Sequence, residues 1–199
     1  MNSKLIEIRK GHTINICTNE TDTDNATSSS TSTWKSKKTI FFIHGSMATY
    51  VQFNDIIDSF KDDFNIVAYD AIGCGNSEKP YDLEYYTPTS LLNDLCEVYE
   101  KYATDQNIVI GHSFGTVQAI RLYNSLMSNN ASTDTNTNTG TNNKSKICNI
   151  ILLGSALMID AKSFLWSLPV WCLELLHPML TAGFADRAFS HSTNEELKQ

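Results

Sequence analysis

The 199-residue chain is short of basic residues. It has 15 Lys and Arg against 22 Asp and Glu, which gives a formal net charge of −7. No block of Lys and Arg stands out along the sequence. Proteins bind nucleic acids through basic patches that neutralise phosphates, so the composition argues against a nucleic-acid partner.

The chain also lacks paired cysteines. It has five, an odd number, at wide spacings and with no Cys-x-x-Cys: Cys17, Cys74, Cys96, Cys148 and Cys172. Disulfide frameworks and zinc sites need closer and paired spacings. We therefore expect reduced thiols, an intracellular and cytoplasmic protein, and no metal or cofactor.

A long apolar run is missing as well. Residues 1–10 have no apolar core of the kind that secretory signals carry. The most apolar stretch, residues 164–180, is interrupted by two prolines, a glutamate and a histidine. It is too short and too broken to span a bilayer, so the sequence predicts no transmembrane segment.

Two stretches have almost no apolar residues. Residues 18–38 and 128–146 consist mainly of Ser, Thr, Asn, Asp and Lys. Such segments cannot bury enough apolar surface to offset the entropy lost on ordering, and we expect them to be disordered insertions. Both fall between expected elements, where extra loop length has a small free-energy cost.

Elsewhere, apolar strands alternate with amphipathic helices. Alternating residues around Gly11 predict an antiparallel hairpin over residues 4–17. Further strands are expected at residues 39–43, 64–69, 107–110 and 147–153, and helices at residues 50–60, 87–102 and 114–126. This order predicts an α/β fold in which a mostly parallel sheet is entered through the hairpin.

The sequence Gly111-His-Ser113-Phe-Gly115 joins the strand at residues 107–110 to the following helix. A strand, a tight turn and a helix in this order expose the serine oxygen beyond the sheet edge. The helix N-terminus favours a negative charge that develops there. A Cβ at either glycine would crowd the strand and the helix. Ser113 is therefore the candidate nucleophile, and the Phe114 N–H is a candidate oxyanion donor.

The loop after residues 39–43 reads His44-Gly45-Ser46-Met47. An oxyanion hole needs a second donor from a loop in this position. Gly45 lets the chain turn inward, and we expect the Ser46 N–H to be that donor. His44 comes too early in the chain to be the catalytic base, so we expect it to brace the loop.

A third loop, residues 70–77, contains Asp70, Gly73 and Gly75. It lacks the third glycine of a dinucleotide-binding fingerprint, which argues against a nucleotide cofactor. Asp70 is expected to brace the loop by accepting hydrogen bonds from backbone N–H groups.

In this order and spacing the three motifs resemble the α/β-hydrolase superfamily, over about residues 4–153. Gly-His-Ser-x-Gly is typical of its serine esterases and lipases, and residues 168–187 are similar to the α/β-hydrolase domain-containing protein 8 branch. The resemblance implies that residues 1–153 form the N-terminal part of the hydrolase core and residues 154–199 part of a helical cap. It also implies that Ser113 is the nucleophile, with Phe114 and Ser46 as oxyanion donors.

In this family the catalytic acid and histidine usually follow later strands, which this sequence does not contain. We therefore expect a C-terminally truncated hydrolase. Asp160, His177 and His191 follow Ser113 in the required order of acid and histidine. They lie in cap-like sequence, where surface or helix-capping roles are the ordinary expectation.

The expected function is hydrolysis of a small-molecule carboxylic ester through an acyl-enzyme at Ser113. The apolar cap makes an acyl lipid a candidate substrate. The alternative is a non-catalytic protein that keeps the turn for folding and binds a partner through the cap. A third option is peroxidase or epoxide chemistry, but epoxide hydrolases of this fold have aspartate where this chain has Ser113. The sequence does not predict the oligomeric state.

Overall fold

We obtained a computed structural model of the chain, which describes residues 1–20, 34, 36–131 and 146–155. The chain divides into two units, Met1–Leu157 and Met158–Gln199. The features below belong to the first unit. The expected cap, from residue 156 onward, and most of both polar insertions lie outside the described residues.

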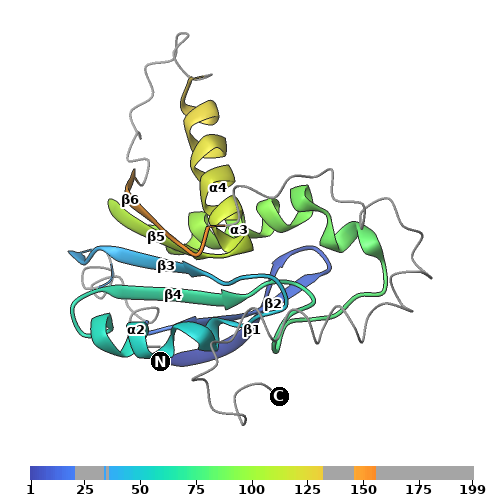
Figure 1. Ribbon diagram of the computed structural model, residues 1–199, viewed down its shortest axis with the longest axis horizontal. Helices are drawn as coiled ribbons and strands as arrows, with labels where there is room; N and C mark the ends of the chain where they lie inside the picture. Colours follow the sequence, from blue (N-terminus) through green and yellow to red (C-terminus); the bar gives the residue numbers. More distant parts are fainter. Residues whose placement is uncertain (21–33, 35, 132–145, 156–199) are drawn as a thin grey trace. The chain divides into compact units, whose positions relative to one another are not determined.

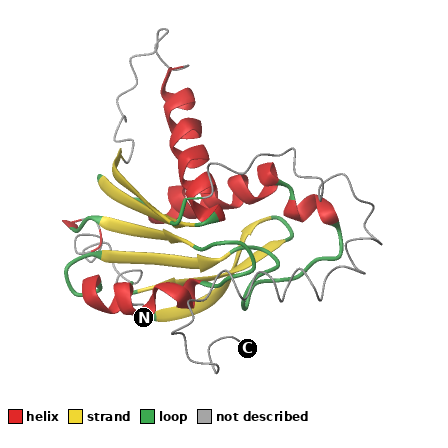
Figure 2. Ribbon diagram, viewed as in Figure 1, coloured by secondary structure: helices red, strands yellow, loops and turns green. Residues whose placement is uncertain are grey.

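A mixed β-sheet forms the centre of the described region (Figures 1 and 2). Its six strands lie in the order β1-β2-β4-β3-β5-β6. Their bounds are β1 (Asn2–Arg9), β2 (His12–Thr18), β3 (Thr39–Ile43), β4 (Asn65–Asp70), β5 (Gln106–His112) and β6 (Lys146–Leu153). β2 pairs antiparallel with β1 and β4, whereas β4, β3, β5 and β6 run parallel. The predicted α/β fold, a parallel sheet entered through a hairpin, is confirmed.

The helical elements follow the predicted order with shifted ends. They are η2 (Tyr50–Phe53), α2 (Asn54–Phe60), η3 (Leu83–Tyr86), α3 (Pro88–Tyr102) and α4 (Phe114–Ala131). The helix predicted at residues 50–60 begins as a 3₁₀ turn, a frequent form at helix N-termini. α4 continues to Ala131, so residues 128–131, which were predicted to belong to the second polar insertion, are helical. No helix within the described residues is long and apolar enough to cross a membrane.

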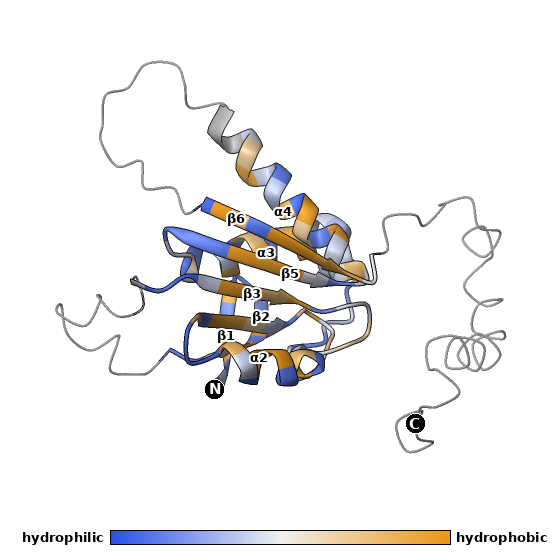
Figure 3. Cartoon of the chain, turned by 60° about the vertical axis from the view of Figure 1, so that its left-hand side comes forward, coloured by the Kyte–Doolittle hydropathy of each residue, from blue (hydrophilic) through white to orange (hydrophobic). Residues whose placement is uncertain are grey.

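Helices cover both faces of the sheet. Successive side chains of a strand point to opposite faces, so Phe41 packs with α3 and α4 while Phe42 packs with η2 and α2. Every residue of β3 is buried, as expected for a parallel strand covered on both faces. Figure 3 shows the apolar character of the inner strands. The carboxyl ends of β3, β4 and β5 therefore meet at one edge, where the three motifs lie.

The connection between β2 and β3 is attached to the core at both ends. The Asn19 amide donates to the carbonyls of Lys61 and Phe64 and accepts from the Ile66 N–H. At the other end, the Trp34 indole N–H donates to the Tyr102 carbonyl at 3.3 Å. Residues 18–20 and 34, inside the predicted insertion, are thus bound to the sheet and its helices.

Candidate active site

Ser113 lies in the turn between β5 and α4, and its backbone is left-handed, with φ of +51°. A residue with a Cβ rarely adopts this conformation, and surrounding contacts must hold it there. The Ser113 N–H donates to the Leu153 carbonyl at 2.9 Å. The Thr116 N–H donates to the Ser113 carbonyl at 3.0 Å, and the Thr116 hydroxyl donates to it at 2.6 Å. The backbone on both sides of the serine is therefore fixed.

The two glycines of the motif allow direct backbone contact between elements. A Cβ on Gly111 would lie 2.5 Å from the Gly115 carbonyl oxygen. A Cβ on Gly115 would overlap the carbonyl oxygen of Ile43 and lie 2.7 Å from that of His44. β5, α4 and the end of β3 therefore meet at distances that exclude any side chain.

The loop after β3 lies against this turn. A Cβ on Gly45 would be 3.1 Å from the Ser113 Cβ. Gly45 is buried, whereas Ser46 and Met47 are exposed, and Met47 has a left-handed φ of +57°. Ser46 and Phe114, the two predicted oxyanion donors, both line the cavity beside the Ser113 turn.

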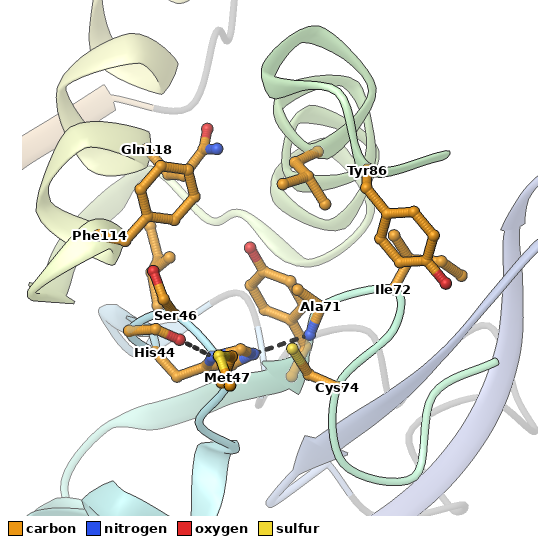
Figure 4. A pocket seen from close by; sticks show the side chains of 13 residues that line it. His44, Ser46, Met47, Ala71, Ile72, Cys74, Tyr86, Phe114 and Gln118 are labelled. Atoms are coloured by element: carbon orange, nitrogen blue, oxygen red, sulfur yellow. Dashed lines mark hydrogen bonds between the residues drawn. The ribbon is translucent and has the colours of Figure 1, made fainter. Parts of the chain in front are cut away.

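His44 links this loop to the turn after β4. Its Nε2 accepts the Ala71 N–H at 2.9 Å, so Nδ1 carries the proton and donates to the Gly45 carbonyl at 2.7 Å (Figure 4). Burial lowers the pKa of His44 below its ordinary value, although the bond to Gly45 and the charge of Asp70 oppose this. A neutral imidazole with both nitrogens occupied serves as a brace and cannot be the base for Ser113.

Asp70 organises the third motif. It is 1% exposed, and one carboxylate oxygen accepts from the Asn15 amide and the Asn76 N–H, both at 3.0 Å. The other oxygen accepts from the Tyr50 N–H at 2.9 Å. These bonds occupy the carboxylate, so it supports three segments and has no catalytic geometry.

Two left-handed glycines complete this loop. A Cβ on Gly75, at φ of +48°, would overlap the Asp70 carboxylate, and one on Gly73, at φ of +84°, would overlap the Tyr86 ring. Both positions therefore need glycine. The described residues contain no group of His, Cys, Asp and Glu side chains that could hold a metal ion.

A cavity of about 200 Å³ lies beside the Ser113 turn (Figure 4). Its lining is largely apolar. It comes from the ends of β3 and β4 with the loops after them, from η3, from the first turn of α3 and from the first two turns of α4: Ile43, His44, Gly45, Ser46, Met47, Tyr69, Ala71, Ile72, Cys74, Tyr86, Leu91, Phe114 and Gln118. Burial raises the pKa of the Cys74 thiol, so this cysteine stays protonated and is a weak nucleophile.

Sequence reasoning missed several of these lining residues, notably Tyr86 and Gln118. Tyr86 follows the third motif along the chain, at the end of η3, and no local pattern marks it. Gln118 did carry a signal, because it is a lone amide in the otherwise apolar segment Val117–Ile120. Its position five residues after Ser113 places it in the second turn of α4.

The catalytic acid and base are not among the residues brought together here. Asp160, His177 and His191 lie outside the described residues. Within residues 1–155, where they are described, no imidazole or carboxylate bonds to the Ser113 hydroxyl. The adjacent His112 is exposed, and its ring lies near Gly45 and Gly154. The described part thus brings Ser113, the predicted nucleophile, close to a cavity lined by Ser46 and Phe114, the predicted oxyanion donors.

Sequence relatives cover only part of the chain. Human protein ABHD8 is 34% identical over 77 residues, which are 38% of this chain and 18% of that protein. A proline iminopeptidase from Lactobacillus acidophilus is 31% identical over 87 residues, or 42% of this chain and 30% of that protein. The matches thus span less than a third of each curated relative, and the link to ABHD8 is weak.

A solved structure matches over the whole chain. The esterase EaEST from Exiguobacterium antarcticum superposes with a TM-score of 0.68 at 17% identity, covering 100% of this chain and 65% of that one. At this identity the likeness concerns the fold alone. The alpha/beta hydrolase family model matches residues 40–196, well over half of the sequence. The chain therefore belongs to the α/β-hydrolase family.

Proposed function

We propose that this protein is a serine hydrolase that cleaves a small-molecule carboxylic ester through an acyl-enzyme at Ser113. The observation that carries the proposal is the left-handed Ser113, held by backbone contacts at the start of α4. Strain of this kind persists only where the surrounding structure imposes it, and it is common at functional residues. The family includes enzymes with other names, among them a peptidase, so the ester is the finer part of the proposal.

The proposed reaction has two chemical steps. The Ser113 oxygen attacks the ester carbonyl carbon and loses its proton to a base, while the carbonyl oxygen becomes an oxyanion. The N–H groups of Phe114 and Ser46 stabilise that charge. The oxyanion collapses, and the alcohol leaves with the proton. Water then attacks the acyl-enzyme by the same route and releases the acid.

The base and its orienting acid stay predictions. Asp160, His177 and His191 are the residues of this chain that follow Ser113 in the required order. Without a base, a serine hydroxyl is a weak nucleophile, and the oxyanion donors alone leave only residual catalysis. An acyl lipid remains within the proposed substrate class because the cavity beside Ser113 is largely apolar.

The test uses the full-length protein with a fluorophosphonate probe and 4-nitrophenyl acetate. We expect labelling and turnover in the wild type and loss of both in Ser113→Ala. The matched pair is Ser46→Ala, which keeps the N–H group, and Ser46→Pro, which removes it. Ser46→Ala should stay near wild type, whereas Ser46→Pro should lower kcat by about 10²–10³-fold. Equal turnover by Ser113→Ala and wild type would refute the proposal, and thermal melting of each variant checks folding.

A non-catalytic binding protein is the second candidate. The observation in its favour is that no described residue activates Ser113, since both nitrogens of His44 are occupied. In that case the wild type would not react with the probe, and Ser113→Ala would retain the biological activity of the protein.

A further inference from the structure

Gln118 is an unusual residue in the wall of the cavity beside Ser113. Its side chain projects from α4 next to Phe114 (Figure 4). The residue is only 4% exposed. Neither its amide oxygen nor its amide nitrogen has a hydrogen-bond partner among the described residues. A buried amide with both ends unpaired is rare in native proteins and requires an explanation.

Two other polar side chains that line the cavity, those of Tyr86 and His44, form hydrogen bonds within the protein. The Tyr86 hydroxyl donates to the Pro80 carbonyl at 2.6 Å. His44 uses both ring nitrogens within the protein. Gln118 therefore offers an unused donor and an unused acceptor within a wall that is otherwise largely apolar. An unpaired buried polar group destabilises the fold. A ligand that pairs with the Gln118 amide would remove this cost.

We propose that Gln118 is a specificity residue that binds a carboxamide carried by the acyl part of the substrate. The Gln118 side chain presents a C=O acceptor and N–H donors in one plane, and a second amide satisfies both at once. This inference rests on the proposed ester hydrolysis, because the carboxamide belongs to the acyl group whose carbonyl carbon Ser113 would attack.

The cavity fits such an acyl group in size and position. Its volume is about 200 Å³, and a protein cavity of about 150 Å³ holds benzene, so an acyl group of roughly eight to nine non-hydrogen atoms is appropriate. Ser46 and Phe114, whose N–H groups would hold the oxyanion, both line it. The acyl part stays on Ser113 through both chemical steps, whereas the alcohol leaves after the first. We therefore assign the cavity between α3 and α4 to the acyl part of the substrate, which remains bound to Ser113.

The experiment compares two esters of nearly equal shape on full-length protein. 4-Nitrophenyl 4-acetamidobutanoate carries the amide, and 4-nitrophenyl 6-methylheptanoate replaces it with hydrocarbon. The measured quantity is the ratio of kcat/KM for the first ester to that for the second. Gln118→Met, which keeps the side-chain length but removes the amide, should lower this ratio by about 10- to 100-fold. The control Gln106→Met changes an exposed glutamine at the start of β5 and should leave the ratio within about twofold.

A binding measurement separates this inference from the proposed function. In Ser113→Ala protein, chemical-shift titration gives the affinities for 4-acetamidobutan-1-ol and 6-methylheptan-1-ol, and their ratio should fall on adding Gln118→Met. If no ester is hydrolysed, the proposed function fails while this binding ratio still decides the role of Gln118. An unchanged ratio in both assays, or a fall only when the amide is moved to the alcohol part of the ester, would overturn the inference.

Thermal melting distinguishes a ligand-binding amide from a structural one. Removing an unpaired buried amide should raise the Tm of Gln118→Met by about 2–4 °C. A lowered Tm, together with an unchanged substrate ratio, would mean that the amide bonds to another part of the protein, and the inference would be wrong.

Discussion

Two turns at the same edge of the sheet are built in opposite ways. The turn after β5 is held by backbone atoms: Gly111 and Gly115 let β3, β5 and α4 touch directly. The turn after β4 is held by a side chain, since the Asp70 carboxylate accepts three hydrogen bonds. In the first turn, backbone atoms form the contacts, and the central side chain is that of Ser113, the proposed nucleophile. In the second turn, the carboxylate itself forms the contacts with the protein.

The contrast separates reactive from supporting residues. A polar side chain whose hydrogen bonds are all satisfied by the protein cannot also serve a substrate, and Asp70 and His44 are of this kind. Ser113 and Gln118 are the residues that we propose to contact a substrate. This distinction between the two groups of residues rests on the hydrogen-bond partners of each side chain, and it uses no comparison with a related protein.

The largest expected effect comes from breaking the backbone contact in the first turn. In Gly115→Ala, the added methyl would overlap the Ile43 carbonyl, which belongs to a buried strand and cannot move easily. We expect a loss of at least about 4 kcal/mol in the free energy of unfolding, or failure to fold. Urea denaturation measures it. Gly154→Ala is the control, because its Cβ would lie 3.7 Å from the nearest atom, so only backbone strain of about 1–2 kcal/mol is added. Equal losses in both variants would contradict the contact.

The second effect comes from weakening the side-chain turn. Asp70→Asn keeps the shape but replaces one acceptor oxygen by an N–H donor that faces other donors. We expect a loss of about 2–4 kcal/mol in the free energy of unfolding, because a buried network loses its charge and keeps unpaired groups. Asp82→Asn, in an exposed loop where Asp82 accepts one bond from Glu84, should lose under about 1 kcal/mol. If the variant folds, fluorophosphonate labelling at Ser113 should persist, since the first turn does not need the carboxylate.

The third effect concerns His44, which joins the two turns. Its folded-state pKa lies below its unfolded value, so acid protonates the unfolded chain first. This contribution to stability is complete above about pH 6.5, the unfolded value, and is lost as the pH falls below it. Each bound proton changes the free energy of unfolding by at most about 1.4 kcal/mol per pH unit. Urea denaturation at pH 7.5 and 5.5 should therefore show a shallower pH dependence for His44→Gln than for the wild type. Identical pH dependence would contradict a depressed pKa.

The smallest effect is a gain of stability. Ser113→Gly removes the Cβ that makes the left-handed backbone costly, and the flexibility of glycine in the unfolded chain offsets part of this. We expect Ser113→Gly to be more stable than Ser113→Ala by up to about 1 kcal/mol, with neither variant labelled by the probe. An alanine variant as stable as the glycine variant would show that this turn stores no strain.

The sequence predicted the elements that depend on local pattern. Buried strands such as β3 show as apolar runs, and the Thr87–Pro88 start of α3 has a capping threonine, whose hydroxyl accepts from the Ser90 N–H. Where a helix ends was less predictable: α4 continues beyond Leu126 to Ala131, although Met127 and Ser128 are exposed. No local pattern in this polar stretch marks the end of the helix.

The residues of the candidate site were also predictable only where a local pattern marks them. Ser113, Gly45 and Asp70 lie in short motifs whose spacing carries the geometry. Other residues of the cavity wall lie outside these motifs. Tyr86 and Gln118 come from separate elements that meet only after folding, so their spacing in the sequence does not reveal that they line one cavity. The partly buried ion pair between Arg9 and Asp94, at 2.7 Å, was missed for the same reason, since it joins the hairpin to α3.

The attachment of Asn19 and Trp34 has a consequence for the segment between them. Because each end of the β2–β3 connection is bonded to the core separately, the register of the sheet does not depend on the length of the intervening chain. Doubling a flexible loop adds only about 0.6 kcal/mol. The connection is therefore a suitable place for an inserted peptide or reporter domain, since the Ser113 turn lies between β5 and α4.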